Sequence, residues 1–227
     1  MSVSVITIDG PAGSGKGTIA HKVASTLGWS LLDSGALYRL VAFDAINKGV
    51  VLNDDAALAV LASQLDVQFV ASDNGKTEIL LQGNKVTLDI RTEDCGCAAS
   101  EVAACPSVRA ALLQRQRDFL QSPGLVADGR DMGTVVFADA FVKIYLTASA
   151  QVRAERRQKQ LKEQGVDVKI GGLVRDIESR DARDSGRKDS PLKPAADALI
   201  IDTDQMDINA VVSKVLSLVD SRSNLEK

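Results

Sequence analysis

A glycine-rich segment follows the β-branched run 3–8 near the start of the chain. Its residues are Gly10, Pro11, Ala12, Gly13, Ser14, Gly15, Lys16, Gly17 and Thr18. Glycines let the backbone curl so that several N–H groups point at one anion, and a helix that begins there adds the positive end of its dipole. The lysine adds a mobile charge suited to the β- and γ-phosphates of a nucleoside triphosphate. The segment therefore predicts a phosphate-binding P-loop, rather than a turn that only joins a strand to a helix.

Position 17 departs from the usual P-loop pattern. Gly17 stands where Ser or Thr normally follows the lysine, and Thr18 comes one position later. Because that hydroxyl normally contacts Mg²⁺, we expect no direct protein ligand for the metal. Mg²⁺ would be held mainly by the phosphates of ATP and by water, with Thr18 as the candidate for a protein contact.

Two further groups of polar residues follow predicted strands. Asp33 and Ser34 come after the apolar run 29–32, and the Asp-Gly-Arg-Asp segment 128–131 comes after the run 125–127. In open parallel sheets, ligand-binding groups gather at the carboxyl ends of the strands. We therefore expect both groups to lie beside the P-loop.

A third polar group is arginine-rich and stands near the end of the chain. Its members are Arg180, Arg183, Asp184 and Arg187. At helical spacing they share one face, which would bring three guanidinium groups and one carboxylate together. The alternative is an exposed ladder of ion pairs, which we favour for Arg183 alone.

The elements that would position these groups alternate along the chain. Apolar runs predict strands at 3–8, 29–32, 125–127, 142–146 and 198–201. Helical spacing predicts helices at 16–27, 36–47 and 208–219. We expect Gly28 to end the first of them. Buried strands separated by helices are typical of an α/β fold, here a P-loop NTPase-type parallel sheet flanked by helices.

One stretch breaks this alternation. The segments 67–70 and 78–81 flank Asn74-Gly75, a dipeptide typical of a β-hairpin turn. The segment 85–87 would add a third strand. We expect a small antiparallel insertion in one globule, rather than a separate tethered domain.

Composition limits the function classes. The 227 residues are 45% hydrophobic and 25% charged, which is enough for a sizeable core. A net charge of −3 and an aromatic content of 4% argue against nucleic-acid partners. No apolar run has the length of a membrane span. We expect a cytoplasmic protein with no membrane partner.

The three cysteines are Cys95, Cys97 and Cys105. Such a sparse, odd set is typical of a reducing compartment. Because no second cysteine pair and no nearby histidine completes a zinc site, we expect buried thiols rather than metal ligands.

A P-loop alone does not distinguish a kinase from other nucleotide-binding proteins. A regulatory GTPase would need an Asn-Lys-x-Asp segment, but Val50 follows Asn47-Lys48-Gly49 and Thr87 follows Asn84-Lys85-Val86. A DNA-linked ATPase would be expected to show a basic face. A small kinase remains.

Together these motifs resemble those of the bacterial cytidylate kinases, a branch of the nucleoside monophosphate kinases. The resemblance rests on the Gly-Lys-Gly-Thr ending of the P-loop, the segments 33–39, 128–137 and 180–187, and the inserted strands. It implies a single domain over 1–227. Its parts would be a core (1–34, 105–152 and 172–227), a monophosphate-binding region with the insertion (35–104) and a short lid (153–171). It also implies a monomer that phosphorylates CMP, and dCMP, with ATP and Mg²⁺.

In such a reaction two polyanions must meet, so charge rather than proton transfer is the main obstacle. The second phosphate pKa of a nucleoside monophosphate is about 6, so its attacking oxygen needs no general base at neutral pH. We expect His21 to be a surface or packing residue. The expected catalytic residues are Lys16, Arg130, Arg180 and Arg187.

The resemblance also implies the contacts of the acceptor nucleotide. Arg39 and Arg130 would clamp its phosphate. Arg180 and Asp184 would hold its ribose and phosphate, and Arg187 would span the transferring group. The full acceptor set is Ser34, Arg39, Ser100, Arg109, Asp128, Arg130, Asp131, Arg180, Asp184 and Arg187.

Cytosine presents an amine donor beside acceptor ring atoms. Asp131 can accept from the amine, and Arg109 can donate to the ring nitrogen and carbonyl, with Ser100 as a second contact. Uracil has a carbonyl where cytosine has its amine, so a carboxylate there would repel it. The alternative for Arg109 is a place on the helix surface with Arg115 and Arg117.

Two interpretations stay open for Arg153 and Arg157, which stand with Arg156 after the run 142–146. They would bind ATP if this segment is a lid that excludes water. They would otherwise lie on a solvated basic helix face. The competing functions are another small kinase, of uridylate or a non-nucleotide metabolite, and a nucleotide-gated binding module.

Overall fold

The computed structural model describes residues 3–71, 77–163 and 165–225. The chain forms two compact units, of which one is Met1–Asp33 with Gln116–Lys227 and the other is Ser34–Arg115. The second unit includes the region 35–104, which was expected to be the monophosphate-binding region. The segment 153–171 belongs to the first unit.

Within the described residues, the first unit is built on five parallel strands in the order β2-β6-β1-β7-β8. They are β1 (Ser4–Asp9), β2 (Ser30–Asp33), β6 (Gly124–Gly129), β7 (Val142–Thr147) and β8 (Leu199–Asp202). The predicted parallel sheet is confirmed. β2 begins one residue later than predicted, because the N–H of Trp29 donates to the carbonyl of Ala24 (2.9 Å) at the end of the preceding helix.

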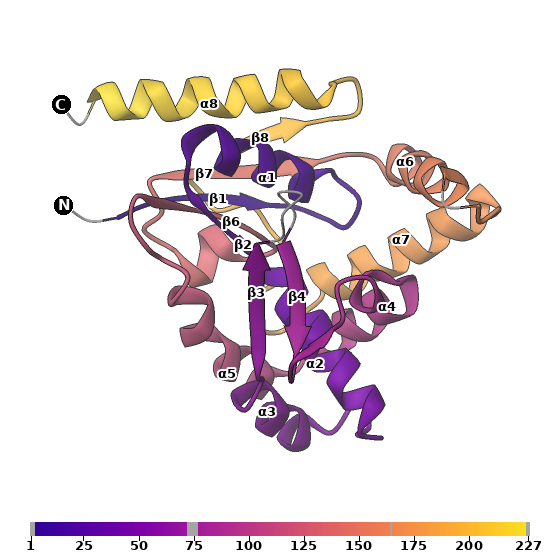
Figure 1. Cartoon of the computed structure of the whole chain (residues 1–227). Coiled ribbons are helices and arrows are strands. Elements are labelled where there is room, and N and C mark those ends of the chain that lie inside the picture. The colour runs from indigo at the N-terminus through magenta and orange to yellow at the C-terminus, as the bar shows by residue number, and fades with distance from the viewer. Residues whose placement is uncertain (1–2, 72–76, 164, 226–227) are drawn as a thin grey trace. The chain divides into compact units, whose positions relative to one another are not determined.

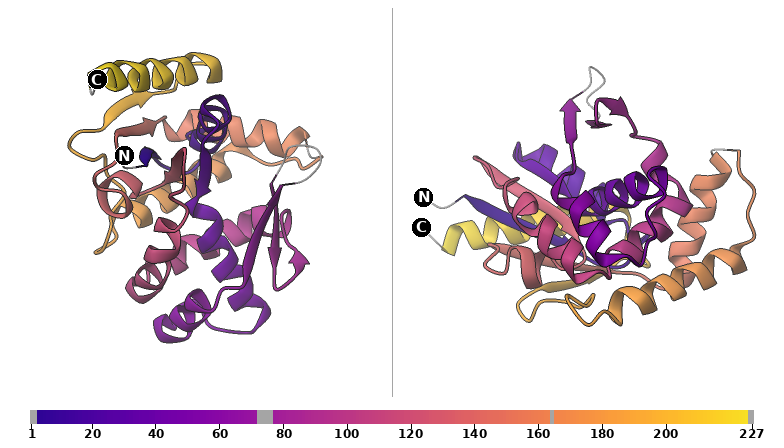
Figure 2. Two further views of the ribbon diagram at one scale, coloured as in Figure 1. Left: turned by 60° about the vertical axis from the view of Figure 1, so that its left-hand side comes forward. Right: turned by 90° about the horizontal axis from the view of Figure 1, so that it is seen from below.

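In the part of the chain that the structure describes, the first unit also contains five helical segments. They are α1 (Lys16–Leu27), α6 (Ala150–Glu163), α7 (Ile170–Ser185), α8 (Ile208–Leu225) and the short π-helix η2 (Met132–Val136). α1 and α8 share one core with apolar residues of β1 and β7 (Figure 1). α1 is capped by Gly28 in a left-handed conformation (φ 66°), as predicted. α6 and α7 lie side by side (Figure 2).

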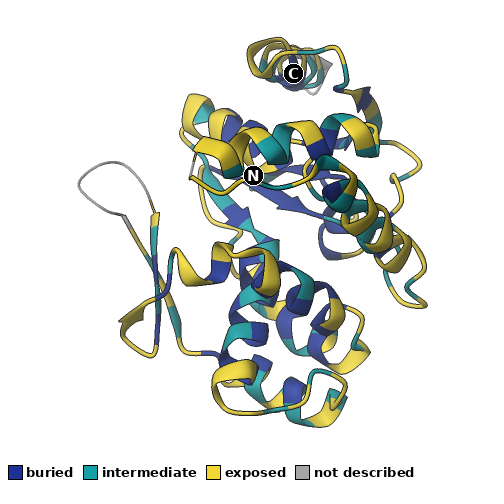
Figure 3. Cartoon of the chain, turned by 90° about the vertical axis from the view of Figure 1, so that its right-hand side faces the viewer, coloured by how far each residue is buried: buried dark blue, intermediate teal, exposed yellow. Residues whose placement is uncertain are grey.

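Helical spacing explains why these helices are buried along one side. In α8, Val211, Val215 and Val219 recur every four residues and are all buried, so they form one apolar stripe. Burying such a side chain stabilises the fold by about 1.5–3 kcal/mol. Figure 3 shows the same division into buried and exposed sides on the other helices. No helix in the described ranges is both long and apolar enough to cross a bilayer.

The second unit joins helices to a small antiparallel sheet. Its helices are α2 (Ser34–Asn47), α3 (Asp55–Ser63), η1 (Asp89–Arg91), α4 (Glu93–Val102) and α5 (Pro106–Arg117), which crosses the unit boundary. Among the described residues, β3 (Val67–Ala71), β4 (Thr77–Leu81) and β5 (Asn84–Lys85) pair in that order. The predicted antiparallel insertion is confirmed. The turn predicted at Asn74-Gly75 lies outside the described residues.

The third strand of the insertion is shorter than the predicted 85–87. β5 ends at Lys85. The N–H of Ile79 donates to the side-chain Oγ1 of Thr87 (2.9 Å) rather than to a backbone carbonyl. The N–H of Val86 still donates to the carbonyl of Ile79 (2.9 Å), but the reciprocal bond of a strand pair is replaced by the one to Thr87.

Candidate active site

The glycine-rich loop begins where β1 ends, against the neighbouring strand β7. A Cβ at Gly10 would lie 2.2 Å from the carbonyl oxygen of Leu146, so this position has no room for a side chain. Gly13 and Gly15 have φ angles of +77° and +88°, a left-handed conformation that favours glycine. Gly15 also precedes the first turn of α1 and has no side chain to cap it. The curled backbone and the open helix end fit a polyphosphate.

Lys16 is buried at the base of this loop, with only 8% of its surface exposed. Its Nζ donates to the carbonyl of Pro11 (3.1 Å). Burial, and then the positive charge of Arg130, lower the pKa of Lys16 to about 7. The carboxylates of Asp128 and Asp33 act in the opposite direction. The ammonium group therefore lacks full compensation from the protein, and an anion in the loop would supply it.

The loop also offers hydroxyl groups. Oγ of Ser14 is buried and makes no hydrogen bond to any described protein group, so it is available to a ligand. Thr18 lies exposed in the first turn of α1. The described residues contain no group of three or more His, Cys, Asp or Glu side chains that could hold a metal.

A buried carboxylate gathers the arginines beside the loop. Asp184 on α7 is 1% exposed and accepts from Nε of Arg130 (3.1 Å) through Oδ2 and from Nη2 of Arg187 through Oδ1. Burial alone would raise the pKa of Asp184, but the charges of Arg130, Arg187 and Arg180 lower it below the ordinary value. Since Arg130 and Arg180 also act on Lys16, these groups form one electrostatic cluster.

The prediction that one helix carries this whole arginine group is wrong. α7 ends at Ser185, and the N–H of Gly186 caps it by donating to Ala182 (2.9 Å). Arg187 therefore lies beyond the helix, yet it still reaches the carboxylate three residues before it. Arg183 is exposed, as predicted.

The segment after β6 faces the P-loop. Asp128 is 8% exposed and Asp131 is 2% exposed. A Cβ at Gly17 would lie 3.2 Å from Oδ2 of Asp128. Arg130 lies between the two aspartates in the sequence and points to the α7 carboxylate. The expected convergence of this segment with the P-loop is confirmed within the first unit.

Sequence reasoning missed Asp9, the last residue of β1. Its Oδ1 accepts from the N–H of Met132 and its Oδ2 from the N–H of Gly133, both at 2.8 Å. Burial raises the pKa of Asp9 to about 7, although these two hydrogen bonds lower it; the charges of Asp131 and Asp128 add to the rise. The one signal in the sequence was a carboxylate at the end of an otherwise apolar strand.

Two expected acceptor residues belong to α2, in the second unit. Ser34 is buried at the start of the helix. Nη1 of Arg39 donates to the carbonyls of Ile90 (2.7 Å) and Thr92 (3.0 Å). A Cβ at Gly96 would lie 2.7 Å from Nη2 of Arg39. The guanidinium is thus held where η1 meets α4.

Two of the three expected base contacts, Ser100 and Arg109, lie in the same unit. Ser100 is 2% exposed on α4. The guanidinium of Arg109 lies 5.7 Å from the centre of the Tyr38 ring, and its Nη1 donates to Ala103 (3.3 Å). Arg109 is half-buried rather than extended into solvent.

Arg153 on α6 supports the P-loop from outside. It is 4% exposed, and its guanidinium donates to the carbonyls of Ala148 (2.9 Å) and Ala12 (3.1 Å). The same group binds both carboxylate oxygens of Asp181 on α7 (3.0 and 2.5 Å). A Cβ added at Gly13 would lie 3.3 Å from the Cβ of Arg153, so the two residues pack closely. A solvated basic face is therefore wrong for Arg153.

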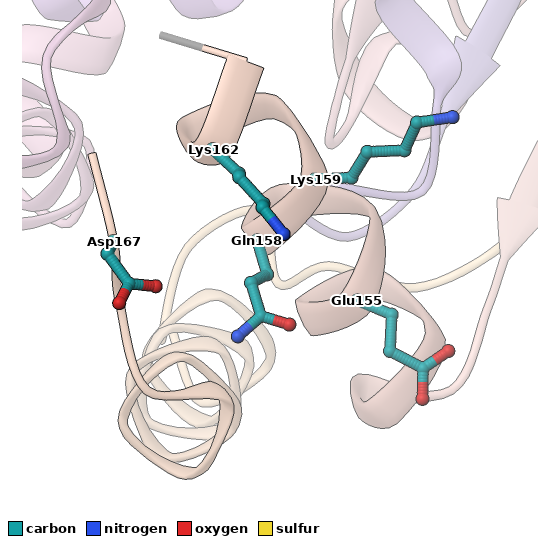
Figure 4. A pocket seen from close by; sticks show the side chains of 5 residues that line it. All are labelled: Glu155, Gln158, Lys159, Lys162 and Asp167. Atoms are coloured by element: carbon teal, nitrogen blue, oxygen red, sulfur yellow. The ribbon is translucent and has the colours of Figure 1, made fainter. Parts of the chain in front are cut away.

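Further along α6, the side chains are less buried than Arg153. Arg157 is half-buried and donates to Gln160 (3.4 Å). A hollow of about 290 Å³ lies further along the helix and the segment after it (Figure 4). It is lined by Glu155, Gln158, Lys159, Lys162 and Asp167. Its lining carries both signs of charge, and none of the expected site residues belongs to it.

The titratable groups set aside in the sequence lie elsewhere. His21 is exposed on α1, in keeping with a surface role. The three cysteines are free thiols. Cys95 is buried and its Sγ donates to the carbonyl of Arg39 (3.4 Å). The expectation of buried thiols is wrong for Cys97 and Cys105, which are partly exposed.

Comparisons with known proteins agree with this geometry. Residues 6–221 match the family model described as cytidylate kinase. A cytidylate kinase of Pseudomonas aeruginosa (strain LESB58) is 59% identical over 216 residues, which cover 95% of this chain and 94% of the relative. A cytidylate kinase of Azotobacter vinelandii is 57% identical over 219 residues, 96% of each chain.

Proposed function

This chain belongs to the cytidylate kinase family, and on that premise we propose how its residues divide the work. The reaction is transfer of a phosphoryl group from ATP to CMP. We extend it to dCMP. The observation that carries the proposal is the buried group of Asp184, Arg130 and Arg187 beside Lys16.

The P-loop binds the phosphates of ATP. Its N–H groups and the start of α1 meet the negative charge, and Lys16 regains its proton beside the β- and γ-phosphates. Magnesium, carried by ATP, would neutralise phosphate charge, with Ser14 and Thr18 as the nearby hydroxyls. Arg153 stabilises the loop through its hydrogen bond to the carbonyl of Ala12. Arg157, one turn further along α6, would contact the nucleotide.

Three guanidinium groups stabilise the charge that develops during transfer. Arg130 and Arg187 are pre-positioned by their ion pairs with Asp184, so they need little reorganisation at the moment of reaction. Arg180 adds its positive charge to the same carboxylate. Such groups make the approach of two polyanions possible. A side chain that removes a proton is unnecessary, since the CMP phosphate, with a second pKa of about 6, already presents an ionised oxygen.

The acceptor is recognised at two ends. Arg39 and Arg130 hold its phosphate, and Arg180 with Asp184 holds its ribose. Ser34 and Asp128 complete this polar lining. The bidentate geometry of arginine suits a phosphate better than the point charge of lysine does.

The base is read by a carboxylate. Asp131 accepts from the amine of cytosine, and Arg109 and Ser100 contact the rest of the ring edge. A uracil carbonyl would face the same carboxylate without a proton between them, which disfavours UMP.

One chain supplies every residue named here, so we propose that the monomer is active. Three free thiols are consistent with a reducing compartment such as the cytoplasm. Sedimentation at the enzyme concentrations used in assays would show a single-chain mass, whereas activity confined to a dimer would contradict the proposal.

The test is phosphoryl transfer from ATP to CMP, dCMP, UMP and AMP, with the Asp131→Asn variant measured alongside. We expect kcat/KM for CMP and dCMP to exceed that for UMP and AMP by at least about a hundredfold. The variant should narrow the CMP-to-UMP ratio. ATP binding without turnover of any monophosphate would overturn the proposed function, and an unchanged ratio in the variant would overturn the role of Asp131.

A further inference from the structure

The carboxylate of Asp9 holds the start of η2. Asp9 lies opposite Gly129 in the register of β1 and β6, and it is 5% exposed. Each of its oxygens accepts one backbone N–H, from Met132 and from Gly133, at 2.8 Å. These two residues come directly after Asp131.

Hydrogen bonds within η2 connect the residues held by Asp9 to Asp131, one of the proposed acceptor residues. The carbonyl of Asp131 accepts from the N–H groups of Val135 (2.9 Å) and Val136 (3.2 Å). The turn is thus closed onto Asp131, and its first two residues, Met132 and Gly133, are tied to Asp9. A shift of η2 relative to β1 would move the backbone of Asp131 and of its neighbour Arg130.

η2 packs tightly against β1 at Gly133. A Cβ at Gly133 would lie 2.8 Å from Oγ1 of Thr7 and 3.4 Å from Oδ2 of Asp9. Thr7 is fully buried, and its hydroxyl makes no hydrogen bond to any described protein group. Along this face of β1, the polar contact to η2 therefore comes from Asp9.

We propose that Asp9 is a positioning residue for the acceptor nucleotide, whose carboxylate fixes the segment Arg130–Asp131 without touching either nucleotide. The inference rests on the acceptor roles proposed above for these two residues. Burying the Asp9 carboxylate near the charges of Asp131 and Asp128 costs free energy, although it satisfies two backbone N–H groups. Its raised pKa, caused first by burial, reflects that cost. In its ionised form the carboxylate accepts charge-assisted bonds, which give a stiffer anchor than neutral acceptors would.

The test compares Asp9→Asn with Thr7→Val. The amide keeps the size of the side chain but presents an NH₂ group to one of the two N–H donors, so that anchor is lost. Thr7→Val removes a hydroxyl without a partner from the same face of β1 and serves as the matched control. Steady-state kinetics in both substrates and thermal unfolding are measured for each variant.

For Asp9→Asn we expect KM for CMP to rise about tenfold or more, which corresponds to the loss of one buried hydrogen bond. The CMP-to-UMP ratio of kcat/KM should fall with it. KM for ATP should stay within about twofold, and Thr7→Val should leave all these values within about twofold. A purely structural role predicts a lower Tm and fewer active molecules with an unchanged KM for CMP, and that result would overturn the inference.

If Asp9→Asn is recovered only unfolded, Gly133→Ala gives the same test. Its methyl group pushes η2 away from β1 and leaves the carboxylate in place, so it should raise KM for CMP and spare KM for ATP. An unchanged KM for CMP in this variant would contradict the inference. The Asp131→Asn variant tests the proposed function, namely the contact of that carboxylate with the base. KM for CMP in the Asp9 and Gly133 variants tests the separate inference that Asp9 positions Arg130 and Asp131.

Discussion

Gly17 and Asp128 stand so close that a Cβ on Gly17 would lie 3.2 Å from Oδ2 of the aspartate. The contact lies at the position where the P-loop departs from its usual pattern. The carboxylate, 8% exposed, takes the space beside position 17 that the Ser or Thr side chain would need. A side chain at position 17 would require this carboxylate to shift by a few tenths of an ångström.

A double-mutant cycle tests this relationship. Gly-to-Ala changes in helices normally stabilise by about 0.5–1 kcal/mol. We expect Gly17→Ala to give no such gain in the wild-type chain, because the methyl group crowds Asp128. In the Asp128→Ala background the gain should appear, with a coupling of about 1 kcal/mol by urea unfolding. Additive effects of the two changes would show that the contact is unimportant.

ATP binding should be coupled to proton uptake. The pKa of Lys16 is lowered to about 7, first by burial and then by Arg130, so at pH 8 most molecules of the free protein carry a neutral Lys16. A polyphosphate beside it raises that pKa again, and about one proton is taken up at pH 8. At pH 6 the lysine is already charged, so the uptake from this group should vanish. Calorimetry in two buffers of different ionisation enthalpy measures both values, and zero uptake at pH 8 would contradict a buried neutral lysine.

Asp184 should be essential for stability as well as for chemistry. Removing the carboxylate leaves Arg130, Arg180 and Arg187 to repel one another in a site that is largely closed to water. Breaking a buried ion pair in this way costs about 3–5 kcal/mol. We expect Asp184→Ala to lose about this much in urea unfolding without ligands. Asp176→Ala, an exposed aspartate on the same helix, should change stability by less than about 0.5 kcal/mol, and equal losses would refute the assignment.

Arg153 should affect the donor nucleotide in particular. Its guanidinium links Ala12 of the P-loop to Asp181 of α7, so Arg153→Met would loosen the loop. We expect KM for ATP to rise about tenfold, the scale of one lost charge-assisted bond, while KM for CMP changes far less. Arg175→Met, at an exposed position on α7, is the control and should leave both constants unchanged. An equal rise in both constants for Arg153→Met would point to general unfolding.

The local sequence pattern was sufficient to predict the parallel sheet and the P-loop. The strands are apolar runs, Gly28 ends α1 in a left-handed conformation, and the glycines of the P-loop have backbone angles that favour this residue type. Each of these features depends on neighbours in the sequence, so spacing and residue type reveal it.

Other features depend on distant parts of the chain. The role of Asp9 arises from hydrogen bonds to residues more than 120 positions away, which no local pattern contains. Arg153 has the sequence context of a solvated helix, but tertiary packing against the P-loop buries it. Arg187 lies beyond the end of α7 because Gly186 caps the helix, a boundary that spacing alone placed too late.

The central claim is that guanidinium groups, and no base, promote phosphoryl transfer. Its most direct test is the single-turnover rate at saturating ATP and CMP for Arg187→Met, with His21→Asn as the control for proton transfer. We expect the arginine variant to lose about 10²–10³-fold in rate, as when one preorganised charge-stabilising group is removed, and the histidine variant to match the wild type. An arginine variant that transfers at nearly the wild-type rate, or a histidine variant that is strongly impaired, would contradict the account.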